Sequence, residues 1–104
     1  MIDQLNELEK TLDELTAKLA DPQVISDQDT YRETGKKLAE ITPAVELFRQ
    51  YRAAESELQE TEEMLAGLSK EDELWEMAQE EREGLVQLKA DLEEKLRIEM
   101  TPKD

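Results

Sequence analysis

The sequence predicts an all-α fold: a long antiparallel helical hairpin, similar to a coiled coil, with a short N-terminal helix packed on its base. Three observations support this. Apolar residues, mostly leucines, recur at intervals of three and four along most of the 104 residues. Only three glycines and three prolines interrupt the chain, so few turns are expected. Aromatic residues make up 4% of the sequence, which favours thin leucine-rich interfaces over a thick globular core.

The first helix is expected over residues 3–20, with Pro22 ending it because the residue before a proline disfavours helical angles. Its apolar stripe consists of Ile2, Leu5, Leu8, Leu12, Leu15 and Leu19. The segment of residues 21–25 then reads as an extended connection. Either Ser26 or Asp27 can cap the helix that follows, by accepting a hydrogen bond from a free backbone N–H.

The second helix is expected over residues 27–66, with Pro43 either bending it or opening a new helix capped by Thr42. We expect one kinked helix. Its apolar positions begin with Tyr31, Leu38, Ile41, Val45 and Phe48. They continue in the alternating spacing of a coiled coil through Leu47, Tyr51, Ala54, Leu58, Thr61, Leu65 and Leu68.

A tight turn over residues 67–69 precedes the third helix, which is expected over residues 70–100. Gly67 suits the left-handed backbone angles that end many helices, and Ser69 followed by Asp72 is typical of a capping box. The inner face of the third helix is expected to carry Leu74, Ala78, Leu85, Leu88, Leu92 and Leu96, with Glu81 interrupting it. Folding about this turn would bring residue 58 close to residue 78.

The composition argues against an enzyme, a metal site or a cofactor. The chain has no histidine and no cysteine, which removes the usual general base, thiol nucleophile and commonest metal ligands. Residues 27–29 begin like a calcium-binding loop. That loop needs glycine at its sixth position and glutamate at its twelfth, where this chain has Arg32 and Leu38. These acidic residues are therefore interpreted as helix-start residues.

The net charge of −15 argues against direct binding of nucleic acid, because phosphate contacts need clustered lysine and arginine. The N-terminus lacks a basic segment followed by an apolar run, and no stretch of about 18 apolar residues suggests a membrane span. A soluble cytoplasmic protein is expected. The charge is uneven: residues 53–83 hold 12 acidic and 2 basic residues, whereas residues 32–52 hold 3 acidic and 5 basic ones.

The acidic segment contains our candidate surface for a protein partner. Its residues are Glu60, Glu63, Glu73, Trp75 and Glu76. The alternative is that the glutamates form ordinary solvated helix faces and that Trp75 packs onto Leu65 and Leu68. A second group could contact RNA backbone or simply belong to amphipathic helices. It combines the basic residues Arg32, Lys36, Lys37, Arg49 and Arg52 with the aromatic residues Tyr31, Phe48 and Tyr51.

Several segments together resemble the bacterial class I peptide chain release factors, in particular the type that reads UAA and UAG. These are the run Asp-Pro-Gln-Val-Ile-Ser-Asp-Gln-Asp-Thr-Tyr-Arg at 21–32, Pro43 with Val45, Phe-Arg-Gln-Tyr-Arg at 48–52 and Thr-Pro-Lys-Asp at 101–104. The resemblance covers nearly the whole chain. It implies the helical N-terminal domain of such a factor, truncated before the codon-reading and Gly-Gly-Gln domains, so no catalytic residue is carried over.

The resemblance also implies an accessory role in translation termination. Such a domain would help to position its factor on the ribosome and would contact the GTPase-associated region or the recycling GTPase. The competing hypothesis is a free-standing acidic coiled-coil adaptor or structural protein that shares only the helical pattern. We also expect that the isolated chain can dimerise, through apolar surface that other domains would cover.

Overall fold

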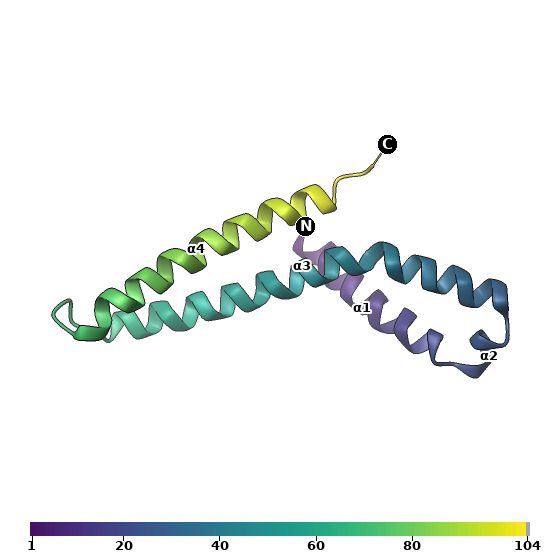
Figure 1. Cartoon of the computed structure of the whole chain (residues 1–104), viewed down its shortest axis with the longest axis horizontal. Helices are drawn as coiled ribbons and strands as arrows, with labels where there is room; N and C mark the ends of the chain where they lie inside the picture. Colours follow the sequence, from purple (N-terminus) through teal and green to yellow (C-terminus); the bar gives the residue numbers. More distant parts are fainter. Residues whose placement is uncertain (104) are drawn as a thin grey trace. The chain divides into compact units, whose positions relative to one another are not determined.

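The computed structural model describes residues 1–103, which form four α-helices and no strand (Figure 1). The helices are α1 (Ile2–Leu19), α2 (Pro22–Ile25), α3 (Gln28–Ala66) and α4 (Glu73–Glu99). The chain divides into two compact units, Met1–Glu46 and Leu47–Asp104, and α3 contributes to both. The expected all-α class with a helical hairpin is confirmed.

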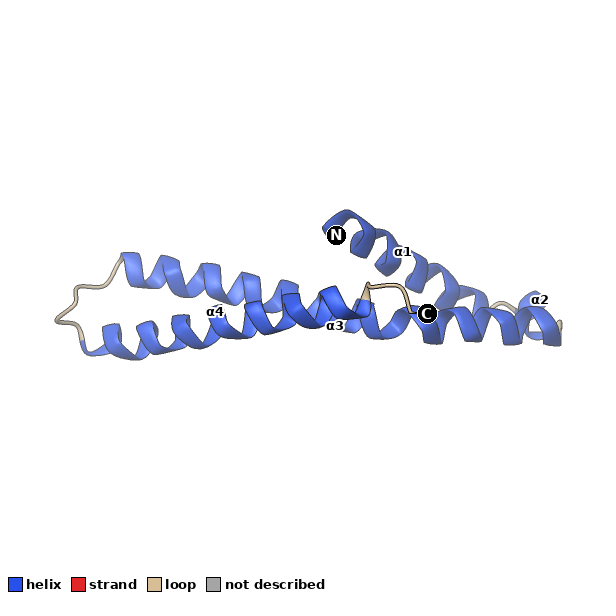
Figure 2. Cartoon of the chain, turned by 90° about the horizontal axis from the view of Figure 1, so that it is seen from above, coloured by secondary structure: helices blue, strands red, loops and turns tan. Residues whose placement is uncertain are grey.

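In the first unit, α1 runs antiparallel to the N-terminal part of α3, and the short α2 connects them (Figures 1 and 2). The helices pack through Leu5 and Leu15 of α1 and through Thr34, Ala44 and Val45 of α3, all of which are buried. Leu8, Leu12 and Leu19 are half-buried, as their common stripe predicts. Ile2 and Tyr31 were expected on the apolar stripes, but they are 43% and 45% exposed.

The connection at residues 21–25 is not extended, as the sequence suggested, but forms the one-turn helix α2. Asp21 has extended backbone angles, and its side chain accepts a hydrogen bond from the Gln23 N–H at 2.9 Å. Pro22 occupies the first helical position, where the missing N–H costs nothing because that group has no partner within a helix. The proline therefore ends α1 and begins α2.

The long helix α3 begins immediately after Asp27, whose carboxylate accepts from the Thr30 N–H at 3.3 Å. This hydrogen bond lowers the pKa of Asp27. The helix then passes through Pro43 without ending. Thr42 does not cap a new helix, because its hydroxyl donates to the Leu38 carbonyl at 2.6 Å, one turn earlier in the same helix. The bend at Pro43 stays a prediction.

In the second unit, the C-terminal part of α3 and α4 lie side by side and antiparallel (Figures 1 and 2). The face of α3 follows the expected spacing. Phe48, Tyr51, Ala54 and Thr61 are buried, and Leu58, Leu65 and Leu68 are half-buried. Each of these positions follows the previous one by three or four residues, so those from Phe48 to Leu65 lie on one side of the helix, while Leu68 lies in the turn that follows.

The face that α4 turns towards α3 differs from the expected one. Its buried residues are Ala78, Leu85, Leu92 and Leu96, whereas Leu74 and Leu88 are 48% and 46% exposed. The half-buried Trp75, Arg82 and Lys89 complete the alternating spacing of three and four. Arg82 and Lys89 thus occupy the packing positions for which Glu81 and Leu88 were expected, since their aliphatic stems can pack while their charged ends stay in water.

The turn between α3 and α4 is also longer than the sequence suggested. The helix α3 ends at Ala66, and α4 begins at Glu73 with Asp72 as its N-cap. The Asp72 side chain accepts from the Leu74 N–H at 2.9 Å, so Asp72 and not Ser69 caps this helix. Gly67 does not have a positive φ angle, which contradicts the expected left-handed helix end.

The pairing of the two hairpin helices follows from one cross-helix contact. Lys89 lies beside Glu55 and Tyr51, as an ion pair at 3.3 Å and with its ammonium 5.6 Å from the ring centroid. The sequence placed residue 58 near residue 78, which would bring residue 55 near residue 81. Glu55 instead pairs with Lys89, eight residues further along α4.

Candidate partner-contact surface

The candidate surface lies at the hairpin tip, which we define as residues 60–76: the end of α3, the turn and the start of α4. Glu60, Glu63, Glu73 and Glu76 are all exposed there, while Trp75 is half-buried. All five belong to the second compact unit. The structure therefore gathers the sequence-predicted residues on one end of the hairpin.

Interactions within each helix explain why some of these tip positions carry glutamate. Glu73 and Glu76 lie in the first turn of α4, where unpaired backbone N–H groups favour negative charge. On α3, the Gln59 side-chain amide donates to the Glu63 carboxylate at 3.4 Å. The helix start thus accounts for two of the four glutamates.

The turn between α3 and α4 carries a further acidic residue, Glu71. The Ser69 hydroxyl donates a short hydrogen bond to the Glu71 carboxylate and also accepts from the Glu71 backbone N–H at 3.2 Å. The bond from the Ser69 hydroxyl lowers the pKa of Glu71. The Glu71 carboxylate consequently stays ionised at neutral pH, and a negative charge in the turn suits a contact with a positively charged partner.

Trp75 has a less exposed position than a free aromatic anchor would have. It belongs to the face of α4 that packs on α3, in sequence with Ala78 and Arg82. Leu65 at the end of α3 and Leu68 in the turn, which the packing alternative pairs with Trp75, are half-buried too. The indole is therefore at least partly a packing group of the tip.

Two of the three aromatic members of the second candidate group are packed rather than free to stack on bases, whereas Tyr31 is 45% exposed. Phe48 and Tyr51 are only 1% and 9% exposed. The guanidinium of Arg52 lies 4.7 Å from the centroid of the Phe48 ring, a cation–π contact that covers the ring. These residues fit the amphipathic-packing interpretation better than an RNA-binding surface.

The middle of the hairpin contains a polar cluster that the sequence did not single out. The Tyr51 hydroxyl donates towards Glu93 at 3.3 Å, and Lys89 pairs with Glu55. Burial raises the pKa of Tyr51, and the hydrogen bond to Glu55 raises the pKa of Lys89. The alternating spacing through Ala78, Leu85 and Leu92 could have pointed to Lys89, but the neighbouring Leu88 was the more apolar choice.

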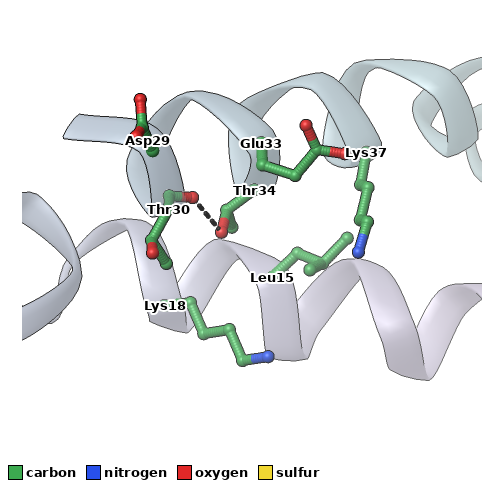
Figure 3. Close-up of a pocket in the computed structure, with 7 residues that line it drawn as sticks. All are labelled: Leu15, Lys18, Asp29, Thr30, Glu33, Thr34 and Lys37. Carbon is green, nitrogen blue, oxygen red and sulfur yellow. Dashed lines mark hydrogen bonds between the residues drawn. The ribbon is translucent and has the colours of Figure 1, made fainter. Parts of the chain in front are cut away.

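A hollow of about 480 Å³ lies in the first unit, between α1 and α3 (Figure 3). Five of its lining residues are exposed: Lys18, Asp29, Thr30, Glu33 and Lys37. The hydroxyl of the buried Thr34 is used within the helix, since it donates to the Thr30 carbonyl at 2.7 Å. Exposed carboxylates and lysines are well hydrated, so the hollow lacks the desolvated acid–base pair that catalysis needs.

Two further properties concern metals and membranes. Over residues 1–103, no group of three or more acidic side chains is arranged to hold a metal ion. In the same part of the chain, none of the helices combines the length and the apolar character that crossing a membrane requires.

Comparison with known proteins gives the chain a family. Residues 8–104 match the model of the PCRF domain. The whole chain is 42% identical to peptide chain release factor 1 of Listeria monocytogenes serotype 4a and covers 29% of that protein. It is 38% identical to peptide chain release factor 1 of Staphylococcus aureus strain JH9, again over 29% of the relative's length. No solved structure is a significant match. With its helical hairpin and a family match over nearly all its residues, the chain belongs to the PCRF domain family.

Proposed function

We propose that this chain is an accessory domain of a translation termination factor. The observation that carries the proposal is the 42% identity, over all 104 residues, to a protein named peptide chain release factor 1. In the proposed role the domain works in the cytoplasm, as part of a factor that binds the ribosome during stop-codon-dependent release of the peptide. It supplies contacts and positioning, not the hydrolytic chemistry.

The proposed contact is made by the acidic hairpin tip with the GTPase-associated region of the ribosome or with the recycling GTPase. Charge supports a protein partner over rRNA, because residues 53–83 carry 12 acidic and 2 basic residues and would repel phosphates. Exposure supports it too, since Glu60, Glu63, Glu73 and Glu76 are all accessible. The half-buried Trp75 would add apolar area beside these charges.

The test is charge reversal in the full-length factor. Changing Glu60, Glu63, Glu73 and Glu76 together to lysine should weaken binding to the ribosome or to the GTPase and slow release at limiting factor concentration. The matched control reverses four exposed acidic residues of the first unit, namely Asp3, Glu7, Glu14 and Glu40. This control changes the net charge equally, so it removes any effect of overall charge.

The two variants distinguish the proposal from a general electrostatic effect. A loss of binding confined to the tip variant supports a specific tip contact. Equal behaviour of both variants, whether both bind normally or both bind weakly, contradicts it. Circular dichroism should show the same helix content in both, because all eight positions are exposed.

A further inference from the structure

The helix α4 has a second apolar face that α3 does not cover. We call it the outer stripe, and its residues are Leu74, Met77, Glu81, Gly84 and Leu88, at alternating intervals of three and four. Leu74, Met77 and Leu88 are 48%, 62% and 46% exposed. The spacing is that of a helix-pairing face, and exposed apolar residues gathered on one face mark interaction sites more often than scattered ones do.

Gly84 gives an independent reason to expect a partner on the outer stripe. A glycine inside a helix is less favourable than alanine, so it usually has a packing reason. Over residues 1–103 the structure shows no contact that requires glycine here, because Gly84 does not have a positive φ angle and a Cβ atom built on it would meet nothing within 4 Å. A missing side chain at this point allows the backbone of another helix to approach α4 closely.

Charge selects the chemistry of that partner. Glu81 lies within the outer stripe, and Glu73, Glu80 and Asp91 lie on its solvent-facing flank by helical spacing, all of them exposed. Nucleic acid and anionic membranes would be repelled. A second copy of this chain would bring the same carboxylates against these, which is unfavourable as well.

We infer that the outer stripe binds an amphipathic helix of another protein that carries lysine or arginine beside its apolar face. The stripe covers residues 74–88, a length of about 21 Å or four helical turns. Leucine-like side chains of the partner would contact Leu74, Met77 and Leu88, and its backbone would cross at Gly84. This inference rests on the proposed function in one respect, namely that the domain serves as a contact for a protein.

The probe is a fluorescent helical peptide of leucine and lysine with about 18 residues, roughly five turns. Its binding to the 104-residue chain is measured by fluorescence anisotropy, with Gly84→Leu as the main variant. This change should raise the thermal midpoint, because it improves helix propensity, and yet weaken peptide binding by about tenfold or more. Ala90→Leu, at an exposed position away from the stripe, is the control and should leave binding unchanged.

Charge variants provide the second arm. Glu81→Lys, in the stripe, should weaken binding several-fold more than Glu83→Lys, which makes the same change on another exposed face of α4. Equal affinity for Gly84→Leu and the unchanged chain, or equal effects of the two charge variants, overturns the inference. So does sedimentation showing a dimer of the unchanged chain that Gly84→Leu abolishes, since the occupant is then a second copy.

The outcome is separable from that of the proposed function. The peptide assay uses no ribosome and no GTPase, and the tip variant of the full-length factor keeps Leu74, Met77 and Gly84. A negative peptide assay with a defective tip variant contradicts this inference alone. A positive peptide assay with a normal tip variant contradicts the tip contact and leaves the outer stripe as a binding face.

Discussion

The Lys89 ammonium of α4 lies 3.3 Å from a Glu55 carboxylate oxygen of α3, and this ion pair joins the two helices in the middle of the hairpin. The side chain of Lys89 is 27% exposed and that of Glu55 is 53% exposed, so water screens their attraction. Pairs of this kind contribute about 0–1 kcal/mol to stability. The pair therefore identifies the register of the hairpin better than it accounts for its stability.

Replacing Lys89 tests this assessment. Lys89→Ala should lower the free energy of unfolding by no more than about 1 kcal/mol, with a smaller loss in high salt. Lys89→Leu should be more stable than Lys89→Ala, because an apolar side chain suits a position between Leu85 and Leu92. Urea unfolding at low and high salt measures both. Arg97→Ala, which removes the exposed pair with Glu94, is the control and should have a smaller effect.

Alkaline pH should weaken the hairpin through Tyr51 and Lys89. Both groups have a raised pKa in the folded chain, so the folded state holds their protons more tightly than the unfolded state. Their contribution to stability is fully present below about pH 10 and is lost as the pH rises through the raised pKa values. In a Tyr31→Phe background, the tyrosinate absorbance of Tyr51 should appear at higher pH than in the urea-unfolded chain. Coincident titrations would refute this.

Two leucines of α4 distinguish the observed packing face from the expected one. Leu85 is 7% exposed and Leu88 is 46% exposed. Leu85→Ala should therefore cost about 2–5 kcal/mol, the range for a buried leucine. Leu88→Ala should stay within about 0.5 kcal/mol, as is usual for a surface position. Chemical unfolding of the two variants compares them directly, and the opposite order would mean that α4 is rotated about its axis.

Gly67→Ala tests the geometry of the turn. Because Gly67 does not have a positive φ angle, alanine fits its backbone conformation. The added Cβ would lie 3.6 Å from the Met64 carbonyl oxygen, an ordinary contact. The change should therefore stabilise the chain by about 0.4–1 kcal/mol, by reducing the entropy of the unfolded state. A loss of stability on thermal unfolding would instead indicate the left-handed conformation that the sequence suggested.

The candidate site was predictable to the extent that charge and exposure follow from the sequence. Glutamates on an amphipathic helix are expected in water, and Glu60, Glu63, Glu73 and Glu76 are exposed. Trp75 could not be placed in the same way, because a large aromatic residue can pack on a partner helix or face the solvent. The structure has it half-buried on the packing face of α4.

The sequence by itself determined the helical class, the hairpin and the packing face of α3. On α3 the apolar residues from Tyr51 to Leu65 offer only one stripe with coiled-coil spacing, so the period fixes the face. The short helix α2 could not be predicted from the sequence. Pro22 both ends α1 and occupies the first position of α2, and a proline in the sequence does not show whether a new helix follows it.

Only the tertiary structure decided the rotation of α4 and its register against α3. The helix has two candidate stripes, one through Leu74 and Leu88 and one through Arg82 and Lys89. Where the two stripes lie side by side, apolar content alone favours Leu88 over the neighbouring Lys89. The second stripe packs on α3 because its basic residues bury their stems while Lys89 reaches Glu55 with its charge. The choice of this face of α4 depends on which α3 residue lies opposite Lys89. The tertiary structure shows that residue to be Glu55, and the sequence of α4 does not.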